Sequence, residues 1–216
     1  MTSTHPIERR PLGMREFPRQ HGPAAEIVAG LRAFTSTDLS DAMNGAFSMD
    51  SALRPAYAGM PRFAGTAVTV AAPTGAVSVR TRAMDLAGEG DVLVVNVQGV
   101  SSFAVLGGIL ASRLRDQGLA GVVIDGCVRD IEEIEEAGLP VLARGTCIRR
   151  PPKEGPGEVN VPVACAGALV CPGDVVVADR NGAVAVPAAF ADEVLAEARR
   201  RAGQTATSRS AAELIH

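Results

Sequence analysis

The chain has 216 residues, of which 47% are hydrophobic and 21% charged, so it can bury one full core. Its formal net charge of −3 gives no general attraction to nucleic acid, and its basic clusters at 149–153 and 199–201 hold no aromatic residues on which bases could stack. No apolar signal segment opens the chain, and no apolar run reaches the roughly 18 residues that a membrane span needs. We therefore expect a cytoplasmic protein without a nucleic-acid or membrane partner.

Histidine and lysine are scarce, which excludes several kinds of catalysis. His5, His21 and His216 all lie in terminal segments, so the interior lacks the residues for Ser–His or Cys–His catalysis or for zinc held by imidazole. Lys153, the one lysine, lies in a proline-rich loop where an amine is poorly desolvated. The four cysteines have no C-x-x-C spacing, so we expect reduced thiols with a packing role. An enzyme of this composition would depend on carboxylates or on a metal held by oxygen atoms.

The first part of the chain alternates helical and strand patterns. Residues 1–23 are polar and interrupted by proline, which predicts a flexible N-terminal arm, and residues 48–62 are predicted to form a loop. Ser36 or Thr37 is predicted to cap the second helix. The predicted elements are, in chain order, a helix over 24–33, a helix from 37, a strand over 65–71, a helix over 79–86, a strand over 91–96, a helix over 107–117, a strand over 120–124, a helix over 130–137 and a strand over 140–143.

From residue 159 onward, short Val and Ala runs are separated by Gly, Pro and Asp, which is typical of an antiparallel meander. The pair Asn181-Gly182 is the strongest hairpin signal in the chain. The sequence GDVLVV at 90–95 recurs as GDVVVA at 173–178, and we interpret both as strands with the same lead-in. A final helix is predicted over 188–201, followed by a tail over 204–216. Helix–strand units followed by a meander predict an α/β fold with a mixed sheet.

Two adjacent glycines open the helix predicted at 107–117. Glycine lets the backbone approach a ligand closely, and the amides at a helix N-terminus favour an anion. The amides of Gly107, Gly108, Ile109 and Leu110 are therefore candidate donors to a carboxylate.

After one helix and one strand, Arg129, Asp130 and Glu133 follow these glycines, and adjacent ends of such units lie at one edge of a sheet. The guanidinium of Arg129 suits a carboxylate or enolate oxygen. Asp130 is a hard ligand for Mg²⁺ or Mn²⁺, and Glu133, one turn further on, could hold a metal-bound water. A purely structural interpretation remains open, in which Asp130 caps its helix, Glu132 and Glu133 favour the helix dipole, and Arg129 pairs outward.

Two long segments resemble the RraA-like family: VVIDGCVRDIEEIEEAGLPVLARGT, and GEVNVPVACAGALVCPGDVVVADRNGAVAVP. The resemblance covers about residues 25–203. The family includes divalent-metal 4-hydroxy-4-methyl-2-oxoglutarate / 4-carboxy-4-hydroxy-2-oxoadipate aldolases and protein inhibitors of ribonuclease E. The stretches GEVNVPV and PGDVVVAD are more similar to the aldolase branch.

The resemblance implies a three-layer β/β/α swivelling-type domain with mixed sheets over 24–203, assembled as a homotrimer or hexamer. It implies that Asp130 binds Mg²⁺ or Mn²⁺ and that Arg129 and the loop amides bind a pyruvoyl group. The implied activity is that of a metal-dependent lyase on a 2-oxo acid through a pyruvate enolate. Aldol cleavage of a 4-hydroxy-2-oxo diacid and decarboxylation of oxaloacetate both fit this description.

Two alternatives accompany this activity. One is a non-catalytic regulator of the ribonuclease E type, against which the intact Arg129-Asp130 pair argues. The other is a different enolate reaction, suggested by Gly108, where the aldolases usually carry an acidic residue that would organise water or transfer a proton. A second departure is Gly75-Ala76-Val77, where many members carry Gly-Asp-Asn.

Overall fold

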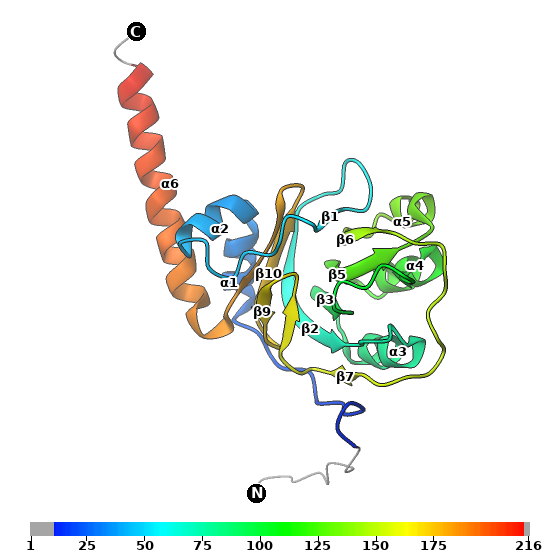
Figure 1. The fold of residues 1–216 in the computed structure, drawn as a ribbon. Helices are drawn as coiled ribbons and strands as arrows, with labels where there is room; N and C mark the ends of the chain where they lie inside the picture. The colour runs from blue at the N-terminus through cyan, green and yellow to red at the C-terminus, as the bar shows by residue number, and fades with distance from the viewer. Residues whose placement is uncertain (1–10, 214–216) are drawn as a thin grey trace, which may run out of the picture.

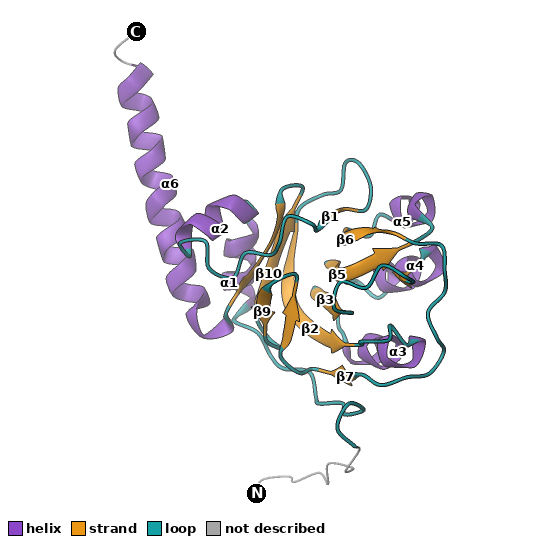
Figure 2. Cartoon of the chain, in the orientation of Figure 1, coloured by secondary structure: helices purple, strands orange, loops and turns teal. Residues whose placement is uncertain are grey.

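A mixed β-sheet organises the protein in the computed structural model, which describes residues 11–213, with side chains described as far as 204 (Figures 1 and 2). Its strands are β1 (Arg54–Pro55), β2 (Phe63–Ala71), β3 (Asp91–Asn96), β4 (Ala104–Leu106), β5 (Gly121–Val128), β6 (Val141–Thr146), β7 (Glu158–Val159), β10 (Val175–Asp179) and β11 (Gly182–Val186). The order across the sheet is β1-β6-β5-β3-β2-β10-β11, with β4 beside β5 and β7 beside β2.

The centre of the sheet is parallel and buried on both faces. Strands β2, β3, β5 and β6 run parallel, whereas β10 returns antiparallel to β2. Every residue of β5 is buried, and so are the valines and the leucine of β3. Burial on both faces explains why these strands are continuous Val-rich runs without polar alternation.

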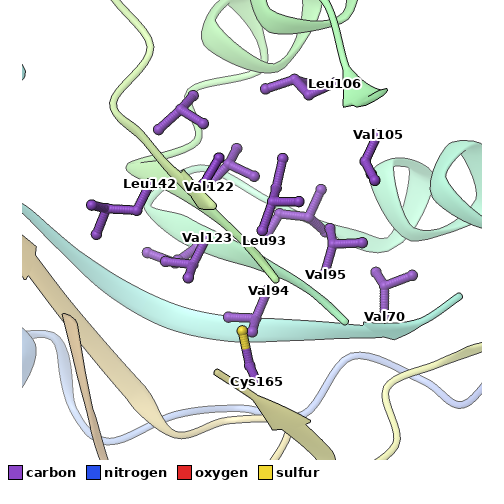
Figure 3. Packing of buried hydrophobic residues seen from close by; sticks show 14 of the residues in the cluster. Val70, Leu93, Val94, Val95, Val105, Leu106, Val122, Val123, Leu142 and Cys165 are labelled. Atoms are coloured by element: carbon purple, nitrogen blue, oxygen red, sulfur yellow. The ribbon is translucent and has the colours of Figure 1, made fainter. Parts of the chain in front are cut away.

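Two further layers cover this sheet. The hairpin of β8 (Val163–Cys165) and β9 (Ala168–Val170) packs on one face, where Cys165 lies beside Val94 of β3 (Figure 3). The helices α3 (Val77–Leu86), α4 (Gly108–Asp116) and α5 (Ile131–Ala137) lie together on the opposite side (Figure 1). This arrangement confirms the expected α/β fold with β/β/α layers.

A second apolar cluster lies at the β10–β11 end of the sheet. It is formed by those two strands with α1 (Ala25–Arg32), α2 (Ser36–Ala42) and α6 (Ala191–Glu213). A single 3-10 turn, Ala188–Phe190, precedes α6. The predicted hairpin is confirmed, because Asp179 pairs with Gly182 across the turn.

The predicted cap of α2 was wrong. Thr35 caps the helix, in a reciprocal arrangement with Asp38, and not Ser36 or Thr37. The backbone amide and hydroxyl of Ser36 instead donate to the buried carboxylate of Asp179, at 2.8 Å each. Ser36 is thus used to join α2 to the β10–β11 hairpin, which local sequence does not show.

Several element bounds also differ from the prediction. Strand β4 was not predicted, β1 lies inside the predicted loop 48–62, and β5 extends to Val128. Helix α6 continues to Glu213, through much of the predicted tail 204–216, and extends away from the rest of the domain (Figure 1). No helix in the described part of the chain is long and apolar enough to cross a membrane.

The predicted flexible arm, 1–23, packs on the domain in the part that is described, from residue 11. The Phe17 amide donates to the Val159 carbonyl at 3.1 Å, and the Arg19 guanidinium makes two hydrogen bonds, 2.7 and 2.6 Å, to the buried carboxylate of Asp91. A bidentate pair with a buried carboxylate holds this segment against the domain. The first ten residues of the predicted arm lie outside the described residues.

Candidate active site

Parallel pairing of β4 with β5 brings the two halves of the predicted motif together. Leu106 of β4 lies opposite Val128 of β5, and the Arg129 amide donates to the Leu106 carbonyl at 2.9 Å. Gly107 and Arg129 therefore leave the sheet side by side at its carboxyl edge, where ligands of α/β proteins bind.

Asp130 has a left-handed backbone conformation, with φ 56° and ψ 52°. This conformation is costly for most residues but is tolerated by Asp and Asn. Asp130 occupies the N-cap position of α5, yet its side chain makes no capping hydrogen bond. Its Oδ2 instead lies 3.3 Å from the Gly108 amide nitrogen and 3.3 Å from Arg129 Nε. The carboxylate therefore faces the start of α4, which contradicts the interpretation of Asp130 as a helix cap.

Neighbouring side chains occupy the space in front of both glycines. A Cβ at Gly107 would lie 2.6 Å from Asp130 Oδ2 and 3.0 Å from Arg129 Nε. A Cβ at Gly108 would overlap the side chain of Glu133, including its carboxylate. Neither glycine has a positive φ, so occupied space and not backbone conformation disfavours a side chain here.

Two of the four predicted amide donors are already engaged. The Leu110 amide donates to the Gly107 carbonyl at 3.1 Å, closing the first turn of α4. The Gly108 amide faces Asp130. This leaves the amides of Gly107 and Ile109 for an anion, at the positive end of the helix dipole.

A cavity of about 750 Å³ opens beside these residues, between α3, α4 and the loop that follows β6. That loop closes one wall by backbone hydrogen bonds, from the Val77 amide to the Pro152 carbonyl and from the Ser78 amide to the Lys153 carbonyl, at 3.0 Å each. Asp130 and Glu154 are the acidic residues in the described lining. Its basic residues are Arg80, Arg82, Arg113, Arg129, Arg150 and Lys153. The lining is therefore strongly cationic and suits a ligand with more than one negative charge.

The structure places the predicted site residues unequally around this cavity. Gly107, Ile109, Leu110, Arg129 and Asp130 line it. The other two predicted residues, Gly108 and Glu133, are not among the lining residues; they lie in contact with each other, and Glu133 is exposed.

The sequence reasoning missed Arg80 and the contribution of α3. The signal that could have found it is an arginine inside an apolar helical stripe, since Val79, Ala83 and Met84 are buried together with Arg80. The expectation for the thiols was sound at Cys127, where burial, followed by the nearby Cys147, raises the pKa and makes a reactive thiolate unfavourable.

The fold and the site together define an α/β domain with a cavity lined by cationic residues at the carboxyl edge of a mixed sheet. A model of the RraA-like family, described as Aldolase/RraA, matches residues 36–185. The chain belongs to the RraA-like family, which confirms the resemblance noted in the sequence.

Relatives in this family carry two kinds of name. A 4-hydroxy-4-methyl-2-oxoglutarate aldolase from Thermus thermophilus is 36% identical over 152 residues, covering 70% of this chain and 92% of that protein. Streptomyces coelicolor RraAS2, described as an unusual member of the RNase ES inhibitor RraA family, is 29% identical with a TM-score of 0.77, covering 88% of this chain and 98% of that one. The RNA-processing inhibitor RraA from Thermus thermophilus is 34% identical with a TM-score of 0.65, covering 71% and 93%.

Proposed function

We propose that this protein is a divalent-metal-dependent lyase that acts on a 2-oxo acid through a pyruvate enolate. Its reaction is the aldol cleavage of a 4-hydroxy-2-oxo diacid, the decarboxylation of oxaloacetate, or both. The observation that carries the proposal is the carboxylate of Asp130, which leaves its own helix uncapped and lies beside Arg129 at the glycine start of α4. The aldolase name of the Thermus thermophilus relative supports the same class of reaction.

The donor set fits a magnesium or manganese ion better than zinc. Within the part of the chain that the structure describes, no three His, Cys, Asp or Glu side chains are grouped to hold an ion. Mg²⁺ is commonly held by one or two carboxylates and keeps several waters, so Asp130 alone is a sufficient protein ligand, whereas structural zinc needs four. An ion bound at Asp130 supplies Lewis-acid stabilisation of negative charge on the keto oxygen.

The protein side chains perform the remaining work. Arg129 binds the carboxylate of the 2-oxo acid with its planar fork and stabilises the enolate oxygen as charge develops there. The amides of Gly107 and Ile109 orient the same carboxylate. In aldol cleavage Glu133 takes the proton of the C4 hydroxyl through a bound water, so that C4 leaves as the carbonyl of the second product when its bond to C3 breaks; in decarboxylation C4 leaves as CO₂. The electron pair of the broken bond passes into the pyruvate enolate, whose C3 then takes a proton from the water held by Glu133.

Glu133 supplies the acidic group that is missing from position 108. Its carboxylate occupies the space where a side chain at Gly108 would begin. A proton-transferring carboxylate can therefore lie beside α4 although the helix itself opens with two glycines. This placement supports lyase chemistry over a purely regulatory role.

We also propose that the protein assembles as a homotrimer or hexamer. Ile109 and Ile148 are 88% and 92% exposed, and both lie beside Arg129 and Asp130 at the mouth of the site. Large apolar side chains exposed next to a functional site are typical of a surface that another subunit covers. Light scattering of the full chain measures this assembly state.

Metal removal tests the proposed function directly. Treatment with EDTA is expected to reduce oxaloacetate decarboxylation and the exchange of pyruvate methyl protons by at least about 100-fold, because charge on the enolate oxygen is then stabilised by Arg129 alone. Added Mg²⁺ or Mn²⁺ is expected to restore both activities. Full activity of the metal-free protein would contradict the proposal.

Transferring the carboxylate from position 133 on α5 to position 108 on α4 tests the role of Glu133. Gly108→Asp alone is expected to destabilise the protein by about 1–3 kcal/mol and to lower turnover, because the new side chain overlaps Glu133 and repels its charge. The double variant Gly108→Asp with Glu133→Ala is expected to recover both properties at least in part. Thermal unfolding and the rates of aldol cleavage and decarboxylation are the measurements. Equal activity of Glu133→Ala and the wild type would remove Glu133 from the mechanism.

A further inference from the structure

Arg80 of α3 is a buried cation without a partner. Its residue surface is 9% exposed, and its Nε is buried with no hydrogen-bond acceptor. Among the residues that the structure describes, no carboxylate forms an ion pair with it. An unpaired guanidinium is expensive to bury, so an anion that reaches it from outside the chain would stabilise this position.

The cavity is the route by which an anion reaches Arg80. Arg80 lines the same cavity as Arg129, and burial together with the charge of Arg129 lowers the pKa of Arg80 to about 10. It therefore remains protonated at neutral pH, beside a second positive charge. Two other cations of the lining already have an acidic neighbour: Arg82 pairs with Glu16, and Arg113 makes an exposed ion pair with Asp85.

Ser78 provides a second, independent observation at the same wall. Its Oγ is buried without a hydrogen-bond partner, and the residue lines the cavity two positions before Arg80. Buried polar atoms in native proteins almost always have partners, so an unpartnered hydroxyl and an unpartnered guanidinium in one cavity wall together indicate a ligand. A cation and a neutral hydroxyl donor suit a carboxylate.

We propose that Arg80 binds the terminal carboxylate of a 2-oxo diacid and so determines the preference for diacids over monoacids. The assignment of the 2-oxo end to Arg129 and Asp130 rests on the proposed function. A diacid satisfies the guanidinium, whereas a monoacid of the same length leaves it buried and unpaired. Sites that leave a buried polar group unpaired discriminate strongly against the ligand that lacks the matching group.

Two ligands with the same carbon chain isolate this contact. In 2-oxoglutarate the chain ends in a carboxylate, and in 2-oxovalerate it ends in a methyl group. Titration calorimetry in the presence of Mg²⁺ is expected to show that the wild type binds 2-oxoglutarate at least about tenfold more tightly, the range for a hydrogen bond between charged groups. Arg80→Met is expected to remove this preference and to leave the affinity for 2-oxovalerate unchanged.

Matched variants separate charge, shape and folding. Arg113→Met removes a cation from the exposed rim and is expected to keep the preference for the diacid. Arg80→Lys keeps the charge without the fork, so it is expected to retain part of the preference. Arg80→Met is expected to melt no lower than the wild type when no ligand is bound, because it removes a buried, unpaired charge.

The outcomes distinguish this inference from the proposed function. Equal wild-type affinity for the two ligands, binding of neither, or an undiminished preference in Arg80→Met would overturn the role of Arg80. An equal loss of affinity for both ligands in Arg80→Met would place Arg80 at the 2-oxo end of the ligand. That result would also overturn its proposed role. If the diacid preference depends on Arg80 while no metal-dependent turnover is detected, the Arg80 site stands and the proposed lyase activity fails.

Discussion

Replacement of Asp130 by Asn is expected to abolish metal binding and to lower kcat/KM by about 10³-fold or more, the scale of losing a major source of electrostatic stabilisation. Asn preserves the shape of the side chain and removes its charge. It also tolerates the left-handed conformation at φ 56°, where Ala would add backbone strain of roughly 1–2 kcal/mol. The Asn variant therefore reports on the carboxylate without a large change in stability.

Mn²⁺ binding by electron paramagnetic resonance, turnover of oxaloacetate and the melting temperature are the three measurements for this variant. Asp116→Asn, at the exposed end of α4, is a control that removes the same charge away from the cavity. Wild-type Mn²⁺ affinity in Asp130→Asn would mean that the metal site lies elsewhere.

The Arg129→Lys variant is expected to keep its metal and to lose substrate. An ammonium group cannot reproduce the planar fork, so kcat/KM for oxaloacetate is expected to fall by about 100-fold while Mn²⁺ affinity changes little. The ion pair between Arg129 and Asp130 contributes little to metal affinity or folding, because both side chains are about one-third exposed, 28% and 34%.

Arg113→Lys is the matched control, since its ion pair with Asp85 is exposed and longer, at 3.6 Å. Steady-state kinetics and a Mn²⁺ titration of both variants separate substrate binding from metal binding. A parallel loss of metal affinity in Arg129→Lys would assign Arg129 to the metal site.

The local sequence pattern was sufficient to predict elements that consist of an unbroken run of buried residues or end at a clear turn signal. The bounds of β3 were predicted without error, and the hairpin after Asp179 was predicted from Asn181-Gly182. Strand β4 is too short to show a period, so only its pairing with β5 defines it. The cap of α2 was mispredicted because the hydroxyl of Ser36 binds Asp179, a residue far away in the sequence.

Part of the candidate site could also be predicted from the sequence. The proximity of Gly107 to Arg129 follows from the rule that parallel strands end at one edge. The position of Glu133 against Gly108 depends on how α5 packs on α4, and the burial of Arg80 depends on which face of α3 meets the sheet. Both are consequences of helix packing, which a single sequence does not specify.

The antiparallel pairing of β10 with β2 also bears on how the nascent chain acquires its sheet. Thr66 pairs with Asp91 on one side and with Val175 on the other, and 83 residues are translated between these two partners. While the ribosome is still adding the intervening residues, one edge of β2 has unpaired amides and carbonyls, and such an edge can pair with strands of other chains. Protection of β2 from that pairing therefore arrives only when the β10–β11 hairpin emerges, late in synthesis.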